Sequence, residues 1–201
     1  MSHFTTVPVN ELEAVNMLLA AIGEAAVSSL ETATTVEVTQ AKNLLSNVNR
    51  AAQQKGWHFN TEWDVVLTRN SENMIPLSSS MLSVHQPGQL MTIRGRSGDM
   101  FAYDLDNNTF TWTKNLNSAV TITLLDFIDS PPTFRQYVTT RAARIFQEEI
   151  IGQVSAETVN RQEEAEAYAD LLDDDAERSG LNVAYGTLDM LNTTQVHRKL
   201  W

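Results

Sequence analysis

Apolar residues recur at helical spacing before and after a central region of the chain. The first predicted helix begins near Asn10, three residues before Glu13 in the spacing of a capping box, and ends at Gly23. The second covers about residues 35–55, where apolar positions follow one another at steps of three or four. A third helix is predicted over residues 134–151 and a fourth from about residue 155 to residue 177. The apolar faces of the first helices predict a shared helical core.

In the central region the apolar period changes from that of a helix to that of a strand. Apolar residues occupy alternate positions from Trp57 to Leu67, as a half-buried strand requires. Several short apolar runs follow, separated by turn residues, which predicts a small antiparallel sheet or sandwich. Trp57, Trp63 and Trp112 lie on these alternating patterns, and we expect them in the core of the β region.

This order of elements predicts an α+β fold, namely a four-helix bundle interrupted by a small antiparallel β insertion domain. The bundle is expected to comprise residues 1–56 and 131–178, and the insertion residues 57–130. Residues 179–201 are expected to form an extended C-terminal tail, because their nine apolar residues follow neither helical nor strand periodicity.

Composition and charge narrow the functional classes. The chain has 201 residues, a net charge of −11 and no cysteine, so it has no disulfide or thiolate metal site. Its negative charge argues against tight binding to DNA or to anionic membranes. No apolar run approaches the length of a membrane span. Much of the acidity lies in the fourth predicted helix, where nine acidic residues accompany two arginines.

Candidate chemistry in the sequence is sparse, and we expect neither a metal nor a cofactor. The four histidines show no ligand spacing. Residues 104–108 resemble the start of a calcium loop, but Thr109 stands where that loop needs glycine, so a hairpin turn is the better interpretation. Two adjacent carboxylate pairs, Glu148 with Glu149 and Glu163 with Glu164, suit a glycosidase only by composition. Adjacent helical residues point in different directions, which favours a solvated helix face.

Seven segments, in three separate blocks, resemble one protein family. They are residues 11–24 (ELEAVNMLLAAIGE), 27–30 (VSSL), 49–50 (NR), 55–60 (KGWHFN), 131–132 (PP), 137–138 (YV) and 141–147 (RAARIFQ). Their order and spacing resemble the tail tubular protein A family, the adaptor or gatekeeper proteins of short-tailed bacteriophages. The resemblance also includes the acidic fourth helix.

The resemblance implies a non-enzymatic connector of the virion tail, assembled in the host cytoplasm. Such a protein forms a twelve-subunit ring below the portal and joins the DNA-filled head to the tail nozzle built from tail tubular protein B. The implied partners are further copies of the chain, the portal protein and the nozzle protein. DNA would pass through the ring without tight binding, and no membrane would be involved.

Within this hypothesis, three sets of residues are candidates for interaction. The portal or a neighbouring subunit is expected to bind four apolar residues of the tail: Tyr185, Leu188, Leu191 and Trp201. Ring contacts between subunits are expected from three arginines, unless these form only a solvated surface: Arg135, Arg141 and Arg144. A negative lumen is expected from four acidic residues: Glu163, Glu164, Glu166 and Asp170.

Two other functions stay open at the level of the sequence. One is a tail-associated glycan hydrolase that uses a carboxylate pair, which release of reducing sugar by the purified protein would reveal. The other is a DNA-binding head-completion factor, which would shift linear DNA in a salt-dependent manner.

Overall fold

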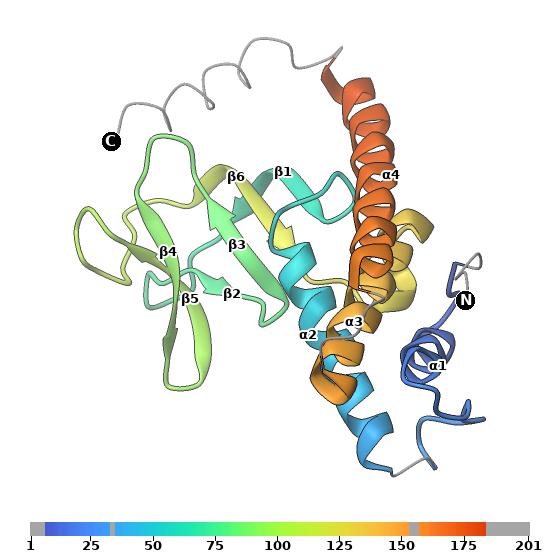
Figure 1. Cartoon of the computed structure of the whole chain (residues 1–201). Helices are drawn as coiled ribbons and strands as arrows, with labels where there is room; N and C mark the ends of the chain where they lie inside the picture. Colours follow the sequence, from blue (N-terminus) through green and yellow to red (C-terminus); the bar gives the residue numbers. More distant parts are fainter. Residues whose placement is uncertain (1–6, 33–34, 153–156, 184–201) are drawn as a thin grey trace.

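The computed structural model describes residues 7–32, 35–152 and 157–183, which contain four α-helices, six strands and one short 3₁₀ helix (Figure 1). The elements in chain order are α1 (Glu11–Ala21), α2 (Val36–Gln53), β1 (Thr61–Leu67), β2 (Pro76–Leu77), β3 (Met81–His85), β4 (Met91–Arg96), β5 (Asp99–Asp104), β6 (Leu116–Thr123), η1 (Phe127–Asp129), α3 (Pro132–Ile151) and α4 (Glu157–Val183).

The starts of the first helices follow their local sequence. The side chain of Asn10 accepts a hydrogen bond from the backbone N–H of Glu13, and Thr35 caps α2 in the same way through Val38. Gly23, which follows α1, has a positive φ of 82°, so its predicted left-handed conformation is confirmed. Helix α3 begins with Pro132 in its first turn, where the missing N–H leaves no helical hydrogen bond unmade.

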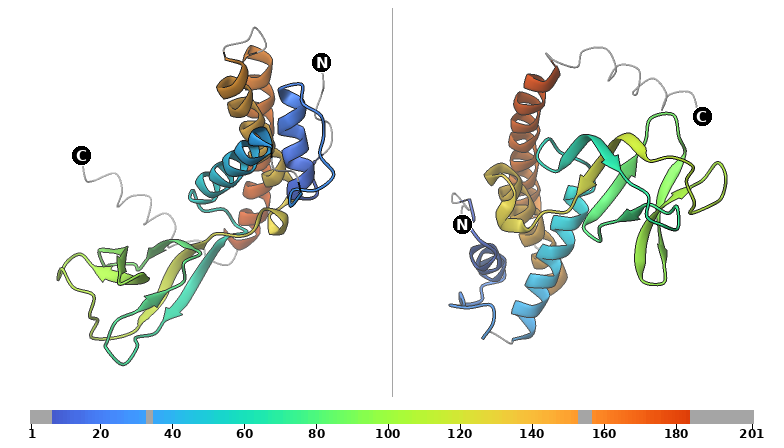
Figure 2. Two further views of the ribbon diagram at one scale, coloured as in Figure 1. Left: turned by 90° about the horizontal axis from the view of Figure 1, so that it is seen from below. Right: turned by 180° about the vertical axis from the view of Figure 1, so that it is seen from behind.

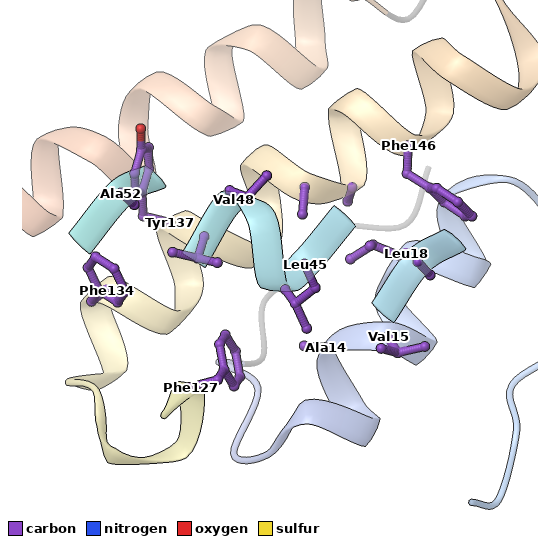
Figure 3. Close-up of a cluster of buried hydrophobic side chains, with 14 of the residues drawn as sticks. Ala14, Val15, Leu18, Leu45, Val48, Ala52, Phe127, Phe134, Tyr137 and Phe146 are labelled. Carbon is purple, nitrogen blue, oxygen red and sulfur yellow. The ribbon is translucent and has the colours of Figure 1, made fainter. Parts of the chain in front are cut away.

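The helical core is built mainly from α1, α2 and α3. The predicted stripe of α2 is confirmed, because Val38, Ala41, Leu45, Val48 and Ala52 are all buried. Figure 3 shows how side chains from the three helices and from η1 meet in this core. Burial of large apolar side chains, each contributing about 1.5–3 kcal/mol, is the main stabilising term of this part.

The prediction of a four-helix bundle interrupted by a β insertion is wrong. Helix α3 packs against each of the other three helices, whereas α1 runs across α4 rather than alongside it (Figures 1 and 2). Helix α4 offers the core only a narrow apolar edge, with Ala167 and Leu171 buried and Tyr168 partly buried. A closed bundle needs a wide apolar stripe on each helix, and the charged residues of α4 leave no room for one.

The strands form two small antiparallel sheets, which agrees with the sandwich alternative of the prediction. The first has the order β1-β6-β3 and the second the order β2-β5-β4. The two sheets enclose a separate apolar cluster, whose buried members are Ile75, Leu77, Val84, Ala102, Trp112 and Leu116. The expectation for Trp112 is therefore confirmed, and its indole N–H donates to the carbonyl oxygen of Ala102 at 3.1 Å.

Trp57 lies in the helical core and not in the β core that the alternating pattern predicted. Its indole N–H donates to the carbonyl oxygen of Ala52 at 2.9 Å, and its ring packs edge-on against Phe134 of α3. Phe127, which follows the last strand, belongs to the same helical cluster. Because both flanks of the β region are built into the helical core, the β region is not a simple insertion into a bundle.

Trp63 is 58% exposed, so its expected place in the β core is also wrong. The pairing of β1 with β6 is irregular between Glu62 and Val65, and Asp64 has a positive φ of 56°. On the facing strand Ser118 also has a positive φ, of 69°. Such a bulge breaks the strict alternation of inward and outward side chains, which turns Trp63 to the outside.

The predicted turn after residue 104 is confirmed. The carboxylate of Asp104 accepts hydrogen bonds from the backbone N–H of Asn107 at 3.0 Å and from its side-chain amide at 2.9 Å. Burial raises the pKa of Asp104, but these hydrogen bonds, with others from Asp106 and Gln89, outweigh it and hold the pKa below its ordinary value.

Helix α4 ends later than its sequence predicts, because it continues through Gly180 to Val183. Glycine lacks a side chain and is a common end signal, but a single glycine inside a helix costs only about 1 kcal/mol. The predicted division into three domains stays a prediction, and residues 184–201 of the predicted tail lie outside the described residues.

Candidate functional site

A cluster of ion pairs fastens α4 to α3. Glu164 of α4 receives hydrogen bonds from Arg144 Nε at 2.5 Å and from Arg141 Nη1 at 3.2 Å. Arg144 also donates through Nη1 to Glu148, one turn further along α3, at 2.7 Å. We call these four residues the Glu164 cluster. Charge-assisted hydrogen bonds here add to the apolar contacts that Ala167 and Leu171 of α4 make in the helical core.

The Glu164 cluster is partly shielded from water. The side chains of Arg144 and Glu164 are 16% and 15% exposed, whereas that of Arg141 is 43% exposed. Burial lowers the pKa of Arg144, but the hydrogen bonds that it donates to Glu164 and Glu148 outweigh this effect and raise the pKa above its ordinary value. The shielded pair therefore holds the helices together more strongly than an exposed ion pair would.

A second set of polar contacts holds the other end of α4. The carboxylate of Asp175 lies 2.8 Å from the backbone nitrogen of His58 and 2.7 Å from its ring Nδ1. The neighbouring Asp174 accepts hydrogen bonds from Thr133 at 3.0 Å and from Arg178 at 2.8 Å. Helix α4 is thus tied both to α3 and to the segment that leads into β1.

Tyr168 lies between these two attachment points. Its ring contacts the rings of Trp57 and Tyr137, with centroid distances of 6.4 Å and 5.1 Å. Lys55 Nζ lies 4.7 Å from the centre of the same ring and 3.3 Å from its hydroxyl oxygen. The inner side of α4 is therefore occupied by contacts within the chain, whereas its outer side is exposed.

The outer side of α4 is an acidic surface. Its exposed carboxylates follow one another at helical steps of four, three and four residues: Glu166, Asp170, Asp173 and Glu177. This spacing places them on one face of the helix. Asp170 and Asp173 form no ion pair or hydrogen bond within the described residues. We call these four residues the acidic face.

The structure separates the four acidic residues expected in a lumen. Glu166 and Asp170 belong to the acidic face, whereas Glu164 points to α3 and Glu163 is partly buried. This separation follows from helix geometry, which sends neighbouring residues to different sides. The two adjacent members Glu163 and Glu164 thus lie in different surroundings.

The three arginines expected to make ring contacts do not form one row. Arg141 and Arg144 bind Glu164 of the same chain, and Arg135 Nη1 donates to the carbonyl oxygen of Ile128 at 2.9 Å. Two of the three arginines expected to contact a neighbouring subunit thus bind a carboxylate of their own chain. The candidate tail residues Tyr185, Leu188, Leu191 and Trp201 lie outside the described residues.

Sequence reasoning did not find the pairing of His58 with Asp175. The residues are 117 positions apart in sequence, and no local pattern connects them. The two arginines of β4 were likewise not predicted as functional residues. The sequence did contain a signal for them, because Arg94 and Arg96 are two positions apart and residues at this spacing lie on the same face of a strand.

In residues 7–32, 35–152 and 157–183, no three His, Asp or Glu side chains come together as a ligand group. Within the same ranges no helix has the length and apolarity needed to cross a membrane.

Comparison with known families decides the assignment. The model of a family described as tail tubular protein matches residues 12–181, which include all four helices up to the last turn of α4 and both sheets. The chain belongs to the tail tubular protein family. Membership identifies a structural component of a phage tail, and the Glu164 cluster and the acidic face are features of this family member. A search of curated proteins gave no match.

Proposed function

We propose that this tail tubular protein is a head-to-tail connector that forms a ring between the portal and the tail nozzle. The observation that carries the proposal is the family match over residues 12–181. The proposed ring has twelve subunits, and its partners are the portal protein and tail tubular protein B. In this proposal the protein assembles in the host cytoplasm and acts as a conduit through which DNA passes without tight binding.

The acidic face supports the conduit role. Glu166 and Asp170 are exposed, and like charge on the wall of a channel repels the phosphates of passing DNA. Glu163 and Glu164 lie on the same helix, but Arg141 and Arg144 neutralise Glu164, so the exposed carboxylates dominate the negative potential of this surface. We propose that α4 contributes to the lumen through these carboxylates.

We propose that arginines of α3 take part in ring closure and that the C-terminal tail binds the portal. We propose that Arg135, Arg141 and Arg144 support contacts between subunits. Arg141 keeps 43% of its side chain exposed while it binds Glu164, which leaves donors available to a neighbour. The apolar tail residues Tyr185, Leu188, Leu191 and Trp201 are proposed to anchor the ring on the portal or on the next subunit.

Electron microscopy of the protein mixed with its cognate portal tests this proposal. We expect a ring of added density on one end of the portal, with twelve-fold symmetry. The matched control replaces the portal with a ring protein of similar size from an unrelated source. Portal particles that carry no added ring would overturn the connector function.

No observation favours the glycan hydrolase. Glu148 and Glu164, one from each candidate pair, both bind Arg144 and so serve the packing of α3 against α4.

A further inference from the structure

The outer face of the second sheet carries two arginines stacked on aromatic rings. The guanidinium carbon of Arg94 lies 3.6 Å from the ring centre of Tyr103, and that of Arg96 lies 5.4 Å from the ring centre of Phe110. The rings of Phe101 and Tyr103 contact Phe110 with centroid distances of 6.4 Å and 4.8 Å. We call these five residues the arginine platform.

The strand register explains how the platform is built. Thr92 lies opposite Tyr103 and Arg94 opposite Phe101, so these side chains share one face of the sheet. Ala102, between the two aromatic residues, points to the other face and joins the apolar cluster between the sheets. The platform therefore lies on the side of the sheet that faces away from the β core.

The two guanidinium groups are held in place but keep their donors. Stacking on a ring uses the flat face of a guanidinium group and leaves the N–H groups at its edge available. Arg94 and Arg96 are both exposed, and no carboxylate forms an ion pair with either among the residues that the structure describes. Arg96 Nη1 donates to the sulfur of Met74 at 3.3 Å. The platform thus presents two oriented cations that lack an anion.

The same chain carries an acidic surface whose charge is opposite to that of the arginine platform. The acidic face of α4 has four exposed carboxylates, and Asp170 and Asp173 lack a partner within the described ranges. Strands β4 and β5 lie at the opposite end of the molecule from α4 in Figures 1 and 2. The two surfaces therefore cannot meet within one chain, but they can meet between two copies.

We propose that the arginine platform of one subunit binds the acidic face of α4 in a neighbouring copy. The contact pairs two different surfaces, so it is a head-to-tail contact, the kind that closes a ring when the rotation between copies allows it. Arg94 and Arg96 donate edge-on to carboxylates such as Asp170 and Asp173, the geometry in which arginine binds carboxylates best. This inference rests on the proposed ring, and it assigns a pair of surfaces to one of its interfaces. A neighbour that covers Asp170 and Asp173 removes both carboxylates from the channel wall, so the inference replaces the lumen role proposed for Asp170 and leaves that role to Glu166.

Nucleic acid is the competing occupant of such a platform. Arginines beside aromatic rings also bind single-stranded DNA or RNA. The net charge of −11 opposes that reading, and the presence of a complementary surface on the same chain favours self-association. The two occupants give different results in the experiment below.

Reciprocal charge reversal tests the contact in the full chain. Sedimentation equilibrium at about 0.5 mM protein should show self-association in about 20 mM salt that weakens in about 500 mM salt, where charges are strongly screened. Arg94→Glu with Arg96→Glu should weaken the association at least about tenfold, and so should Asp170→Lys with Asp173→Lys. An equimolar mixture of the two variants should associate again, because each supplies the surface that the other lacks. The matched control is Arg50→Glu with Lys114→Glu, which changes the net charge by the same amount at exposed positions outside both surfaces. It should associate as strongly as the wild-type chain.

Several outcomes would overturn the inference. They are a wild-type chain that stays monomeric in low salt, an Arg94→Glu and Arg96→Glu variant that associates as the control does, and a mixture that fails to associate. Salt-sensitive binding of a single-stranded oligonucleotide that the same two substitutions abolish, without self-association, would assign the platform to nucleic acid. Should the glutamate variant unfold, Arg94→Lys with Arg96→Lys keeps the charge, and it should weaken association only in part.

The portal experiment separates this inference from the proposed function. If the Arg94→Glu and Arg96→Glu variant still builds complete rings on the portal, the interface is wrong but the connector function stands. If the wild-type chain builds no ring on the portal yet self-associates as described, the connector function fails and the contact stands.

Discussion

The side-chain amide of Gln53 forms two hydrogen bonds with the backbone of Leu125, 72 residues further along the chain. Its Nε2 donates to the carbonyl oxygen of Leu125 at 2.9 Å, and its Oε1 accepts from the N–H of Leu125 at 2.8 Å. Gln53 is fully buried, and Asn60 donates to its backbone oxygen at 3.0 Å. The end of α2 is thus joined to the segment that leaves β6.

We expect Gln53→Leu to destabilise the protein by about 2–4 kcal/mol. The substitution leaves the N–H and the carbonyl of Leu125 without their partner, and each buried unsatisfied group costs about 1–3 kcal/mol. Urea denaturation followed by circular dichroism measures the loss. The control is Gln54→Leu at the exposed neighbouring position, which should change stability by less than about 0.5 kcal/mol. Equal effects of the two substitutions would contradict this role of Gln53.

Glu164→Gln should lower the free energy of unfolding by about 2 kcal/mol, because it leaves the shielded guanidinium of Arg144 with one anionic partner instead of two. The loss should appear first as easier opening of α4, measured by hydrogen exchange of its amides. Glu166→Gln, two residues away on the acidic face, is the matched control and should leave exchange in α4 unchanged. Unaltered exchange in both variants would mean that apolar contacts alone hold α4.

Gly56→Ala should destabilise more than Gly88→Ala. Both glycines have a positive φ, of 75° and 76°, so the backbone strain is the same. A Cβ at Gly56 would lie 2.7 Å from Cδ1 of Ile122, whereas a Cβ at Gly88 meets nothing within 4 Å. We expect a difference of about 1 kcal/mol in thermal or urea unfolding. In an Ile122→Val background, which removes Cδ1, that difference should shrink, and an unchanged difference would refute the steric explanation.

The stability that Asp174 contributes should depend on pH in the acid range. Burial raises the pKa of Asp174, but hydrogen bonds from Arg178 and Thr133 outweigh it and hold the pKa below its ordinary value of 3.8. A depressed folded-state pKa stabilises the protein at pH values above 3.8, and this stabilisation is lost as the pH falls through the folded-state pKa. Asp174→Asn should therefore be less stable than wild type at neutral pH and approach it in strong acid. Asp173→Asn, at an exposed position, should show no such convergence.

A chain that ends at Val183 should keep its fold and lose portal binding. It retains every element that the structure describes and lacks the proposed anchor residues Tyr185, Leu188, Leu191 and Trp201. Helical circular dichroism and the thermal transition should match those of the full chain, while binding to immobilised portal should fall sharply. Trp201→Ala should weaken binding in part, since large aromatic side chains contribute much of the binding energy at interfaces. Undiminished binding by the shortened chain would contradict the anchor.

Periodicity predicted the individual helices well but not their arrangement. The apolar stripe of α2 is buried along its whole length, because a face that repeats every 3.6 residues has to be covered by something. The stripe does not specify which helix covers it, and the bundle prediction failed at this step. The failure at Trp63 has a different cause, since one residue of positive φ at Asp64 reverses the direction of the side chains around it.

Of the candidate site on α4, the sequence predicted which residue types are present but not which of them pair. The acidity of α4 is evident in the sequence, and helix geometry alone separates Glu163 from Glu164. The pairing of Glu164 with Arg141 and Arg144 depends on how α3 packs against α4, which no local pattern encodes.

The irregular pairing of β1 has a consequence for solubility before assembly. Strand β1 lies at the edge of its sheet and carries Trp63 and Val66 exposed to solvent, a combination that invites strands of other chains to add on. The bulge around Asp64 breaks the row of regularly spaced N–H and carbonyl groups that such a strand would need. The left-handed backbone at Asp64 therefore works against the edge-to-edge addition of strands from other copies, which would otherwise lead to aggregation.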